Sequence, residues 1–441
     1  MAQEQEKRLG DFRKLEQARL CTHCGFCLPV CPTYRAHNEE MQSPRGRVSV
    51  ILAFMNGLMT KEEAGQTLSF CLSCRACHAA CPAGVRVGKL VMLARSLMSV
   101  SKPWRTRLFH GITDRAWLSR PVAWMVRWYQ GSMVRKVLHR WPSGGGHRWD
   151  RLIPTYRESF RGCRPSGMKG MKGDRFSVIH GWVTGEKPLR AALLCGCMGR
   201  MFYPGVATST ASLLARLGVR VEFLEGFGCC GAPHREGGDR KRFLKQAKKV
   251  LDRFRPVADR VDVVLCDSAA CRVTVGGYAR ALAHDAEYEL LARRFVEKVI
   301  DFSDLIANRC LDPETFFAEK IAKRVVFMDH CQTRNSLGVM DRPRQLLDAV
   351  AGDRVELSGG GACCGAGGDT LLSHPRHCEP IRDGRINAIM ASGASIVTGT
   401  NPGCLLNVEA GFAAARHPIV VRHLAELLWE SCAGEGRTVD R

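Results

Sequence analysis

The sequence predicts an α+β protein of several domains, in which a helical N-terminal domain is followed by two repeated α/β domains. Three observations lead to this prediction. The chain has 441 residues, which is enough for two to four domains. Two cysteine-rich runs of identical spacing lie within the first hundred residues. One pattern of cysteines, strand-like segments and helix-like segments then occurs twice in the C-terminal part.

The composition is that of a globular protein with an unusual number of cysteines. The first 16 residues are charged and lack the apolar region of a signal peptide. The longest apolar stretch, residues 48–59, is shorter than the ~20 residues that a membrane-spanning helix needs. Twenty-two cysteines without an export signal indicate metal binding or redox chemistry in a reducing compartment. We therefore expect a cytoplasmic protein, or one attached peripherally to the cytoplasmic membrane face.

The formal net charge of +22 allows two interpretations. One is attraction to an acidic partner subunit, an anionic membrane surface or nucleic acid. The other is a solvated, arginine-rich surface without a particular partner. No nucleic acid is expected, because no recognised nucleic-acid-binding motif accompanies the charge.

Both N-terminal runs have the form C-x2-C-x2-C-x3-C-P. In this pattern the first three cysteines wrap one 4Fe-4S cluster, and the fourth ligates the neighbouring cluster. Structural zinc sites are the alternative, but they usually have two separated cysteine pairs. We therefore expect two 4Fe-4S clusters, one held by Cys21, Cys24, Cys27 and Cys81, the other by Cys71, Cys74, Cys77 and Cys31.

The segment between the two runs is expected to be helical. Residues 44–47 read Pro-Arg-Gly-Arg and precede an apolar helix predicted over residues 48–59. A helical ferredoxin fits this insert better than a compact βαββαβ ferredoxin, whose two runs lie closer together. Within the second run, Arg75 and His78 are expected to face solvent, although either could tune the potential of a cluster.

Residues 101–185 contain no cysteine motif, and Cys163 stands alone there. Tryptophans alternate with arginines in the first half of this segment, which fits either an interfacial helix on anionic lipid or a linker helix docked on the core. Residues 142–146 and 162–173 have the composition of flexible loops. The tryptophans concerned are Trp104, Trp117, Trp124, Trp128 and Trp141.

The C-terminal repeat consists of a lone cysteine, an adjacent pair and a last cysteine. The lone cysteine precedes the pair by 32 positions in both copies, and the last follows the pair by 41 and 40 positions. Each copy also ends alike, because residues 299–306 resemble residues 421–428. The first set is Cys197, Cys229, Cys230 and Cys271, and the second is Cys331, Cys363, Cys364 and Cys404.

These cysteines follow predicted strands, and an amphipathic helix is predicted over residues 241–254. Strand ends are where α/β folds build sites, and the glycines beside each pair allow a bulky group to approach the backbone. We expect metal or redox chemistry in at least one copy, the alternative being buried, unreactive thiols. His330 could supply positive charge beside Cys331 or could simply be a satisfied hydrogen-bonding residue. The strands are predicted over residues 191–194, 261–265, 325–328 and 395–397.

Together these features resemble the iron–sulfur subunit of bacterial glycolate oxidase, over nearly the whole chain. The resemblance rests on the two ferredoxin runs, on Ser-Pro-Arg-Gly-Arg at residues 43–47, and on two CCG domains, named after Cys229-Cys230-Gly231 and Cys363-Cys364-Gly365. It extends to iron–sulfur subunits of D-lactate and anaerobic glycerol-3-phosphate dehydrogenases. The CCG domains are similar to those of heterodisulfide reductase, which implies that one or two further iron–sulfur clusters can be held there.

The heterodisulfide reductase pattern ends each CCG domain in C-x2-C, but Ser268 and Asn401 occupy the first of those positions here. This departure argues against direct disulfide reduction. Cys195 and Cys266 could add a ligand in the first copy or could pack as ordinary core residues. The expected domains are a dicluster ferredoxin (residues 1–100), a basic aromatic-rich linker (101–185), a first CCG domain (186–310) and a second (311–432).

The resemblance implies an electron-transfer subunit of a flavin-linked 2-hydroxy acid (glycolate) dehydrogenase complex. A FAD-containing dehydrogenase subunit would oxidise the substrate, and this chain would pass the electrons towards a quinone or another acceptor. No G-x-G-x-x-G follows a predicted strand and opens a helix, so no flavin site and no catalytic residue are expected on this chain. The alternatives are a stand-alone heterodisulfide reductase-like enzyme, a subunit of a D-lactate or glycerol-3-phosphate dehydrogenase, or an iron–sulfur sensor.

Overall fold

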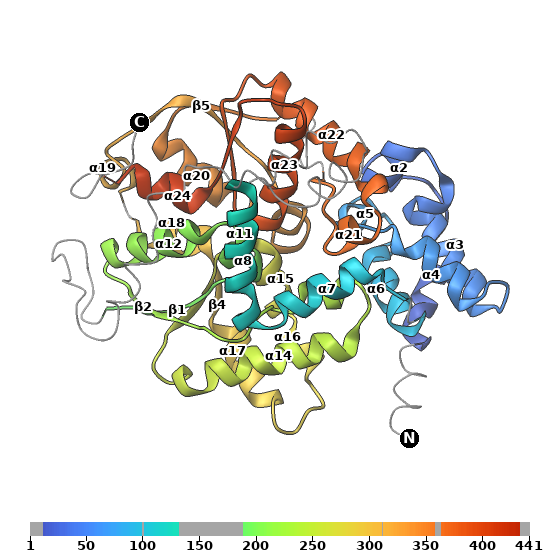
Figure 1. Cartoon of the computed structure of the whole chain (residues 1–441). Helices are drawn as coiled ribbons and strands as arrows, with labels where there is room; N and C mark the ends of the chain where they lie inside the picture. The colour runs from blue at the N-terminus through green and yellow to red at the C-terminus, as the bar shows by residue number, and fades with distance from the viewer. Residues whose placement is uncertain (1–11, 99–100, 132–187, 311, 358–362, 433–441) are drawn as a thin grey trace.

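The computed structural model describes residues 12–98, 101–131, 188–310, 312–357 and 363–432. Figure 1 shows a helical N-terminal domain on one side of two α/β units, with a pair of helices lying across the front of those units. The multidomain α+β class predicted from the sequence is confirmed. Cys163, Trp141 and the loops predicted over residues 142–146 and 162–173 lie outside the described residues.

The N-terminal domain is built from helices packed around a core that includes Ile51, Leu68 and Val91. The insert between the two cysteine runs is helical, as predicted, but its main helix begins at Pro44 and ends at Met55. The Ser43 hydroxyl accepts a hydrogen bond from the Gly46 amide (2.9 Å) and Pro44 occupies the first turn, so the helix begins earlier than residue 48. The elements are η1 (Glu16–Leu20), α2 (Pro32–His37), η2 (Glu40–Gln42), α3 (Pro44–Met55), α4 (Lys61–Ser69), α5 (Ala76–Ala79) and α6 (Val87–Met98).

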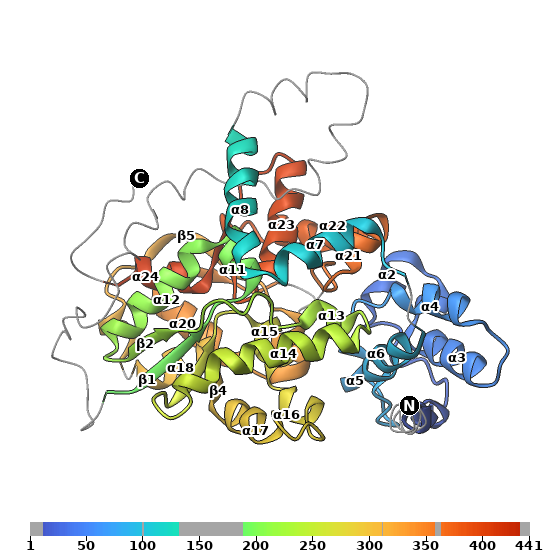
Figure 2. The same cartoon turned by 60° about the horizontal axis from the view of Figure 1, so that its bottom comes forward.

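Two helices, α7 (Trp104–Thr113) and α8 (Ala116–Gly131), connect the N-terminal domain to the α/β units. Helix α7 contacts α21 (Thr370–Ser373), and α8 contacts α11 (Cys197–Phe202). The pair therefore docks on both units, and Figure 2 shows α8 rising from the upper edge of the molecule.

The first α/β unit contains a parallel sheet of four strands in the order β2-β1-β3-β4. Its strands are β1 (Arg190–Leu194), β2 (Arg220–Phe223), β3 (Val263–Cys266) and β4 (Val299–Asp301). Its further helices are α12 (Pro204–Arg216), α13 (Ala232–Glu236), α14 (Arg240–Phe254), η5 (Arg255–Val257), α15 (Ala269–Val275), α16 (Tyr278–Ala281), α17 (Glu289–Lys298) and α18 (Phe302–Arg309).

The second unit repeats this arrangement, with a parallel sheet in the order β6-β5-β7-β8. Its strands are β5 (Ile321–Phe327), β6 (Ala351–Val355), β7 (Ile396–Gly399) and β8 (Val420–His423). Its helices, besides α21, are α19 (Pro313–Phe316), a π-helical turn η6 (Thr333–Leu337), α20 (Asp341–Val350), α22 (Pro375–Ala391), α23 (Pro402–Ala414) and α24 (Leu424–Glu430).

The four strands predicted from the sequence are β1, β3, β5 and β7, which are the central strands of the two sheets. Central parallel strands are covered on both faces and read as continuous apolar runs, which makes them recognisable. The edge strands β2, β4, β6 and β8 were not predicted. Strand β2 has no fully buried residue and β6 has none either, so neither carries such a run.

The two units pack against each other reciprocally. Helix α12 of the first unit contacts α24 of the second, and α18 contacts α20 in the corresponding way. The same reciprocity joins α11 with α23 and α15 with η6. One hydrophobic core runs through both units and includes Leu193, Phe302, Val326 and Leu427. The cysteine-bearing ends of the two units therefore face each other across a pseudo-two-fold arrangement.

Candidate iron–sulfur sites

The eight N-terminal cysteines lie in two neighbouring hollows. The fourth cysteine of each run lies with the first three of the other run, which is the grouping expected from the crossed pattern. Cys77 borders both hollows. We call these hollows site 1, lined by Cys21, Cys24, Cys27 and Cys81, and site 2, lined by Cys31, Cys71, Cys74 and Cys77.

The two runs share an unusual backbone conformation. The residues on either side of the middle cysteine have positive φ angles, namely His23 (55°) and Gly25 (87°) in the first run, and Ser73 (53°) and Arg75 (61°) in the second. Three of these residues are not glycine, and such residues rarely adopt this conformation without a functional reason. Each run therefore curls tightly, bringing its first three thiols to one hollow, which fits the loop that wraps a 4Fe-4S cluster.

The expectation that Arg75 and His78 face solvent is wrong for Arg75, which is buried, whereas His78 is half-buried. The Arg75 guanidinium lies against the second α/β unit, where it donates a hydrogen bond to the Ser336 hydroxyl (2.9 Å). His78 Nε2 accepts a hydrogen bond from the Gly88 amide (3.0 Å). Burial lowers the pKa of His78 to about 4, so the ring is neutral at physiological pH.

Arg47 is a buried cation beside site 2 that the motif search did not single out. Its Nη1 lies 3.8 Å from Cys31 Sγ, and its Nη2 donates to Thr33 Oγ1 (2.9 Å). Burial lowers the pKa of the guanidinium, but negative charge on Cys71 and Cys31 outweighs this and the pKa is raised overall. Its position in Ser-Pro-Arg-Gly-Arg was visible in the sequence, although its approach to a thiol was not.

All eight cysteines of the C-terminal repeat line one cavity of about 800 Å³ between the two α/β units. In each copy the thiols form a series of contacts in the same order, and Cys364 Sγ lies 2.8 Å from Cys404 Sγ. We call the sets site 3, in the order Cys331–Cys363–Cys364–Cys404, and site 4, in the order Cys197–Cys229–Cys230–Cys271.

The thiols of sites 3 and 4 are in surroundings that favour the protonated form. The Cys331 thiol donates a hydrogen bond to Cys363, and this bond and burial raise the pKa of Cys331. The Cys197 thiol donates to Cys229 in the same way, and this bond and burial raise the pKa of Cys197. A positively charged iron centre favours thiolates and displaces their protons. The donor set of four thiols in each site, all buried except the half-buried Cys331, therefore fits a metal cluster.

The glycine after each cysteine pair is required by the local geometry. Gly231 has a φ of 88°, and a Cβ there would lie 2.9 Å from the Phe243 ring. Gly365 has a φ of 80°, and a Cβ there would lie 2.8 Å from the Cys378 carbonyl oxygen. Both glycines therefore let the chain turn sharply after the paired cysteines. That they allow a bulky group to approach the backbone stays a prediction.

Ser268 and Asn401, the two residues that depart from the C-x2-C pattern, are in contact with each other. The Ser268 hydroxyl donates to Asn401 Oδ1 (3.1 Å), and Asn401 Nδ2 donates to Cys404 Sγ (3.2 Å). His330 Nε2 accepts hydrogen bonds from the amides of Thr400 (2.9 Å) and Asn401 (3.1 Å). Burial lowers the pKa of His330 to about 3, so it is a neutral acceptor that orders this loop and not a source of positive charge.

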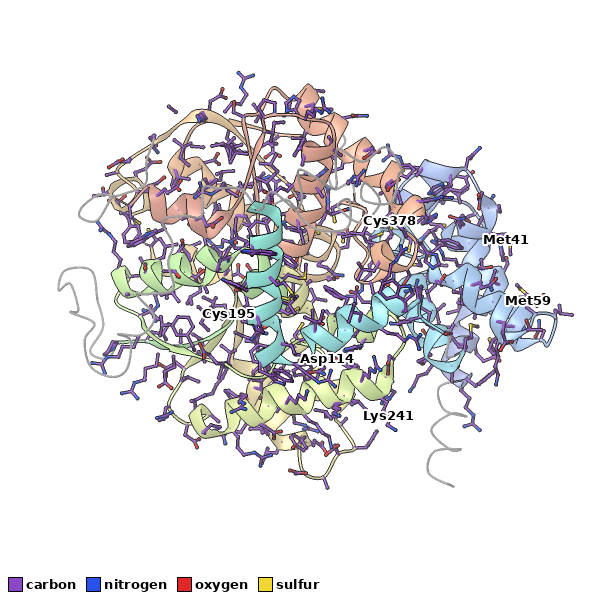
Figure 3. All side chains as sticks on the ribbon, in the orientation of Figure 1. Met41, Met59, Asp114, Cys195, Lys241 and Cys378 are labelled. Atoms are coloured by element: carbon purple, nitrogen blue, oxygen red, sulfur yellow. The ribbon has the colours of Figure 1, made fainter. Side chains whose placement is uncertain are left out.

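Cys195 and Cys266 belong to the hydrophobic cores of the first unit and do not line the cavity. Figure 3 shows Cys195 beside the strands of that unit, whereas Cys378 lies where the second unit meets the N-terminal domain. Across the described ranges, no three His, Cys, Asp or Glu side chains converge at the spacing of a single metal ion. Sites 1 to 4 are therefore defined by the hollows that their cysteines share and by contacts between thiols, and not by the spacing of ligands around a single metal ion.

Site 2 adjoins site 3. Asn335, in η6, donates its side-chain amide to the Cys74 carbonyl (2.8 Å). Leu72 belongs to the same small hydrophobic cluster as Cys363, with Cys74 packed against it. Burial raises the pKa of Cys74, and negative charge on Cys331 raises it further. The second ferredoxin run and the second cysteine set therefore lie side by side.

A helical domain with two such runs, joined to two cysteine-paired α/β units, defines a class of iron–sulfur oxidoreductase subunits. The model of the 4Fe-4S dicluster domain matches residues 17–85, and the model of the cysteine-rich domain (CCG) matches residues 191–276 and 325–409. The probable glycolate oxidase iron–sulfur subunit of Bacillus subtilis is 30% identical over 428 residues, 93% of each chain. The chain belongs to the family of glycolate oxidase iron–sulfur subunits.

Two other relatives show how far the likeness extends. The glycolate oxidase iron–sulfur subunit of Escherichia coli K12 is 26% identical over 408 residues, covering 91% of this chain and 93% of the relative. Lactate utilization protein A of Geobacillus kaustophilus is 30% identical over 241 residues, covering 54% of this chain and 98% of the relative. In the described part of the chain, no helix has both the length and the apolar character needed to cross a membrane.

Proposed function

We propose that this chain carries electrons from a FAD-containing dehydrogenase subunit, which oxidises a 2-hydroxy acid such as glycolate, towards a quinone or another acceptor. A 4Fe-4S cluster accepts and releases one electron at a time, and sites 1 and 2 are proposed to hold one each. Sites 3 and 4 are proposed to hold one or two more. The observation that carries the proposal is the continuous series of the four cysteine sites, from an exposed edge to an interdomain cavity.

Site 1 is the proposed entry point. Cys24 is exposed, and Phe26, between Cys24 and Cys27, is 67% exposed. Leu20 and Val30 are also exposed beside this run. Exposed apolar side chains around an exposed cysteine form a surface that suits a protein partner, which must approach closely to deliver electrons. We place the flavoprotein subunit here.

The interior of the path follows from contacts already described. Sites 1 and 2 share Cys77 at their border, and Asn335 joins the Cys74 backbone to the second α/β unit. Site 3 therefore receives electrons before site 4. The cavity that both sites line is the proposed exit, and its lining is mainly apolar, including Phe202, Leu371 and Leu406. We propose that the complex lies in the cytoplasm, peripherally at the membrane face, because clustered cysteines without an export signal are typical of a reducing compartment.

Two experiments test the subunit role. The purified chain, prepared anaerobically, should hold about eight irons or more and should not oxidise glycolate or lactate with an artificial acceptor. Turnover by the flavin-free chain would overturn the proposal. Co-expression with a FAD-containing 2-hydroxy acid dehydrogenase subunit should give substrate-dependent reduction of the clusters, measured by electron paramagnetic resonance.

A matched pair of variants tests the exit. Cys363→Ala should lower electron delivery to quinone in the complex while the signals of sites 1 and 2 stay intact. Cys378→Ala is the control, because Cys378 is equally buried nearby but does not line the cavity. Equal rates of quinone reduction for wild type and Cys363→Ala would show that electrons do not pass through site 3.

One observation favours lactate as an alternative substrate of the complex, namely the 30% identity to a lactate utilization protein. A stand-alone disulfide reductase is less well supported. Ser268 and Asn401 are hydrogen-bonded to each other at the interface of the two units. The C-x2-C pattern of heterodisulfide reductase would have cysteines at these two positions. Assays of the complex with glycolate and D-lactate would rank the two hydroxy acids.

A further inference from the structure

Helices α7 and α8 carry a concentration of exposed apolar side chains. Along α8, Trp117, Trp124 and Trp128 are spaced seven and four residues apart, which places them on one side of the helix. They are 72%, 67% and 59% exposed. The opposite side of α8, with Ser119 and Ala123, is buried. We define the aromatic face as the exposed side chains of Trp104, Leu108, Trp117, Trp124, Met125 and Trp128.

The segment that carries the aromatic face is itself strongly basic. Residues 101–131 contain six lysines and arginines and a single acid, Asp114. Arg107 and Arg115 are exposed, whereas Asp114 accepts from His234 Nε2 (2.8 Å) and is turned towards the first α/β unit. Figure 3 shows Asp114 where α7 and α8 meet. Tryptophan combined with basic residues is the composition of segments that lie in the headgroup region of anionic bilayers.

Helix α7 is tied to the second α/β unit beside the cavity of sites 3 and 4. Lys102 forms an ion pair with Asp369 (2.5 Å), and the Thr106 hydroxyl bonds to the Ser373 hydroxyl (3.1 Å). On α7 itself, Phe109 and Arg105 line the cavity. Helix α7, which carries Trp104 and Leu108 of the aromatic face, therefore also borders the proposed exit for electrons.

We propose that the aromatic face is a docking site for the surface of an anionic lipid bilayer. The tryptophans insert among the headgroups and the arginines contact lipid phosphates, so that the chain lies on the membrane without crossing it. Docking in this position brings α7, whose Phe109 lines the cavity, close to the lipid from which an apolar acceptor is drawn. The direction of electron flow rests on the proposed function, but binding to lipid does not.

The test is sedimentation of the full cluster-loaded chain with sucrose-loaded vesicles. Vesicles of phosphatidylglycerol and phosphatidylethanolamine should retain the chain, and neutral phosphatidylcholine vesicles or high salt should release much of it. The triple variant Trp117→Ser/Trp124→Ser/Trp128→Ser should bind the anionic vesicles about tenfold more weakly. The control Leu58→Ser/Leu290→Ser removes two side chains that are 77% and 71% exposed elsewhere, and should bind as wild type does.

Two further readouts separate the outcomes. Brominated lipid should quench the tryptophan fluorescence of wild type, and reduction of a water-soluble dye by the complex should be unchanged in the triple variant. Failure of wild type to bind, or equal binding by the triple variant, overturns the proposal. If the triple variant instead loses the flavoprotein subunit with vesicle binding unchanged, the aromatic face is a protein interface and the proposal is wrong. Loss of dye reduction in wild type would count against the proposed function alone.

Discussion

Replacing Arg47 by glutamine should lower the reduction potential of the cluster proposed for site 2. The guanidinium is buried, and its Nη1 lies 3.8 Å from Cys31 Sγ. Reduction adds a negative charge to the cluster, and a fixed positive charge nearby favours that state. Removing the cation therefore makes reduction harder.

The size of the shift follows from Coulomb's law. A unit charge acting over roughly 4 to 6 Å, at an effective dielectric constant of about 20, is worth about 3 to 4 kcal/mol. For a one-electron couple this corresponds to roughly 120 to 180 mV. Because the cluster charge is spread over several atoms and the variant relaxes, we expect a fall on the order of 100 mV.

An anaerobic redox titration followed by electron paramagnetic resonance measures this shift. Arg47→Lys keeps the charge and should stay close to the wild-type potential, which separates charge from packing. Arg45→Gln is the matched control, since Arg45 borders site 1, is partly exposed and pairs with Glu40 (2.7 Å). If Arg47→Gln retains its iron and leaves the potential unchanged or raises it, the electrostatic reasoning is refuted.

Three other outcomes can be checked independently. Burial raises the pKa of Asp301 to about 6, so its carboxyl is protonated more readily in the folded chain, and the stability that this contributes is lost as pH rises from about 4 to 6. Asp301→Asn, which keeps an acceptor for the Ser303 amide, should remove up to about 3 kcal/mol of this pH dependence, measured by melting temperature across that range; identical pH profiles would contradict it. Cys195→Ala should leave iron content unchanged because this thiol does not line the cavity, and a loss of iron would make it a ligand. Cys81→Ser should damage the cluster of the first run and Cys31→Ser that of the second, as resolved by electron paramagnetic resonance; the reverse pattern would contradict crossed ligation.

The parts of the fold that the sequence predicted are those with a local signal. The central strands β1, β3, β5 and β7 are continuous apolar runs, and the N-terminal insert has a helical pattern. The edge strands β2 and β6 carry no such run, because one or both of their faces remain partly exposed. The start of α3 was missed because a serine cap and a proline in the first turn outweighed the polar residues that follow.

For the sites, the cysteine spacing predicted which thiols share a hollow, but it carried no information about how the domains meet. Arg75 is buried by Ser336, which lies 261 residues further along the chain, and no local pattern encodes that contact. The meeting of sites 3 and 4 in one cavity likewise depends on the packing of two separate units. Ser268 was recognised as a departure from a motif, yet its bond to Asn401 required the assembled structure.

The reciprocal packing of the two α/β units has a consequence for how this chain can be cut and how it can change. Each unit's last helix, α18 or α24, lies against the other unit, and the largest hydrophobic core draws residues from both. A fragment that ends between the units would expose one side of that core to water. The packing of the two duplicated units therefore resembles that of a homodimer whose subunits are joined in one polypeptide. Apart from Cys364 and Cys404, the shared core consists of side chains outside sites 3 and 4, so we expect the halves to stay packed together when one thiol of either site is lost.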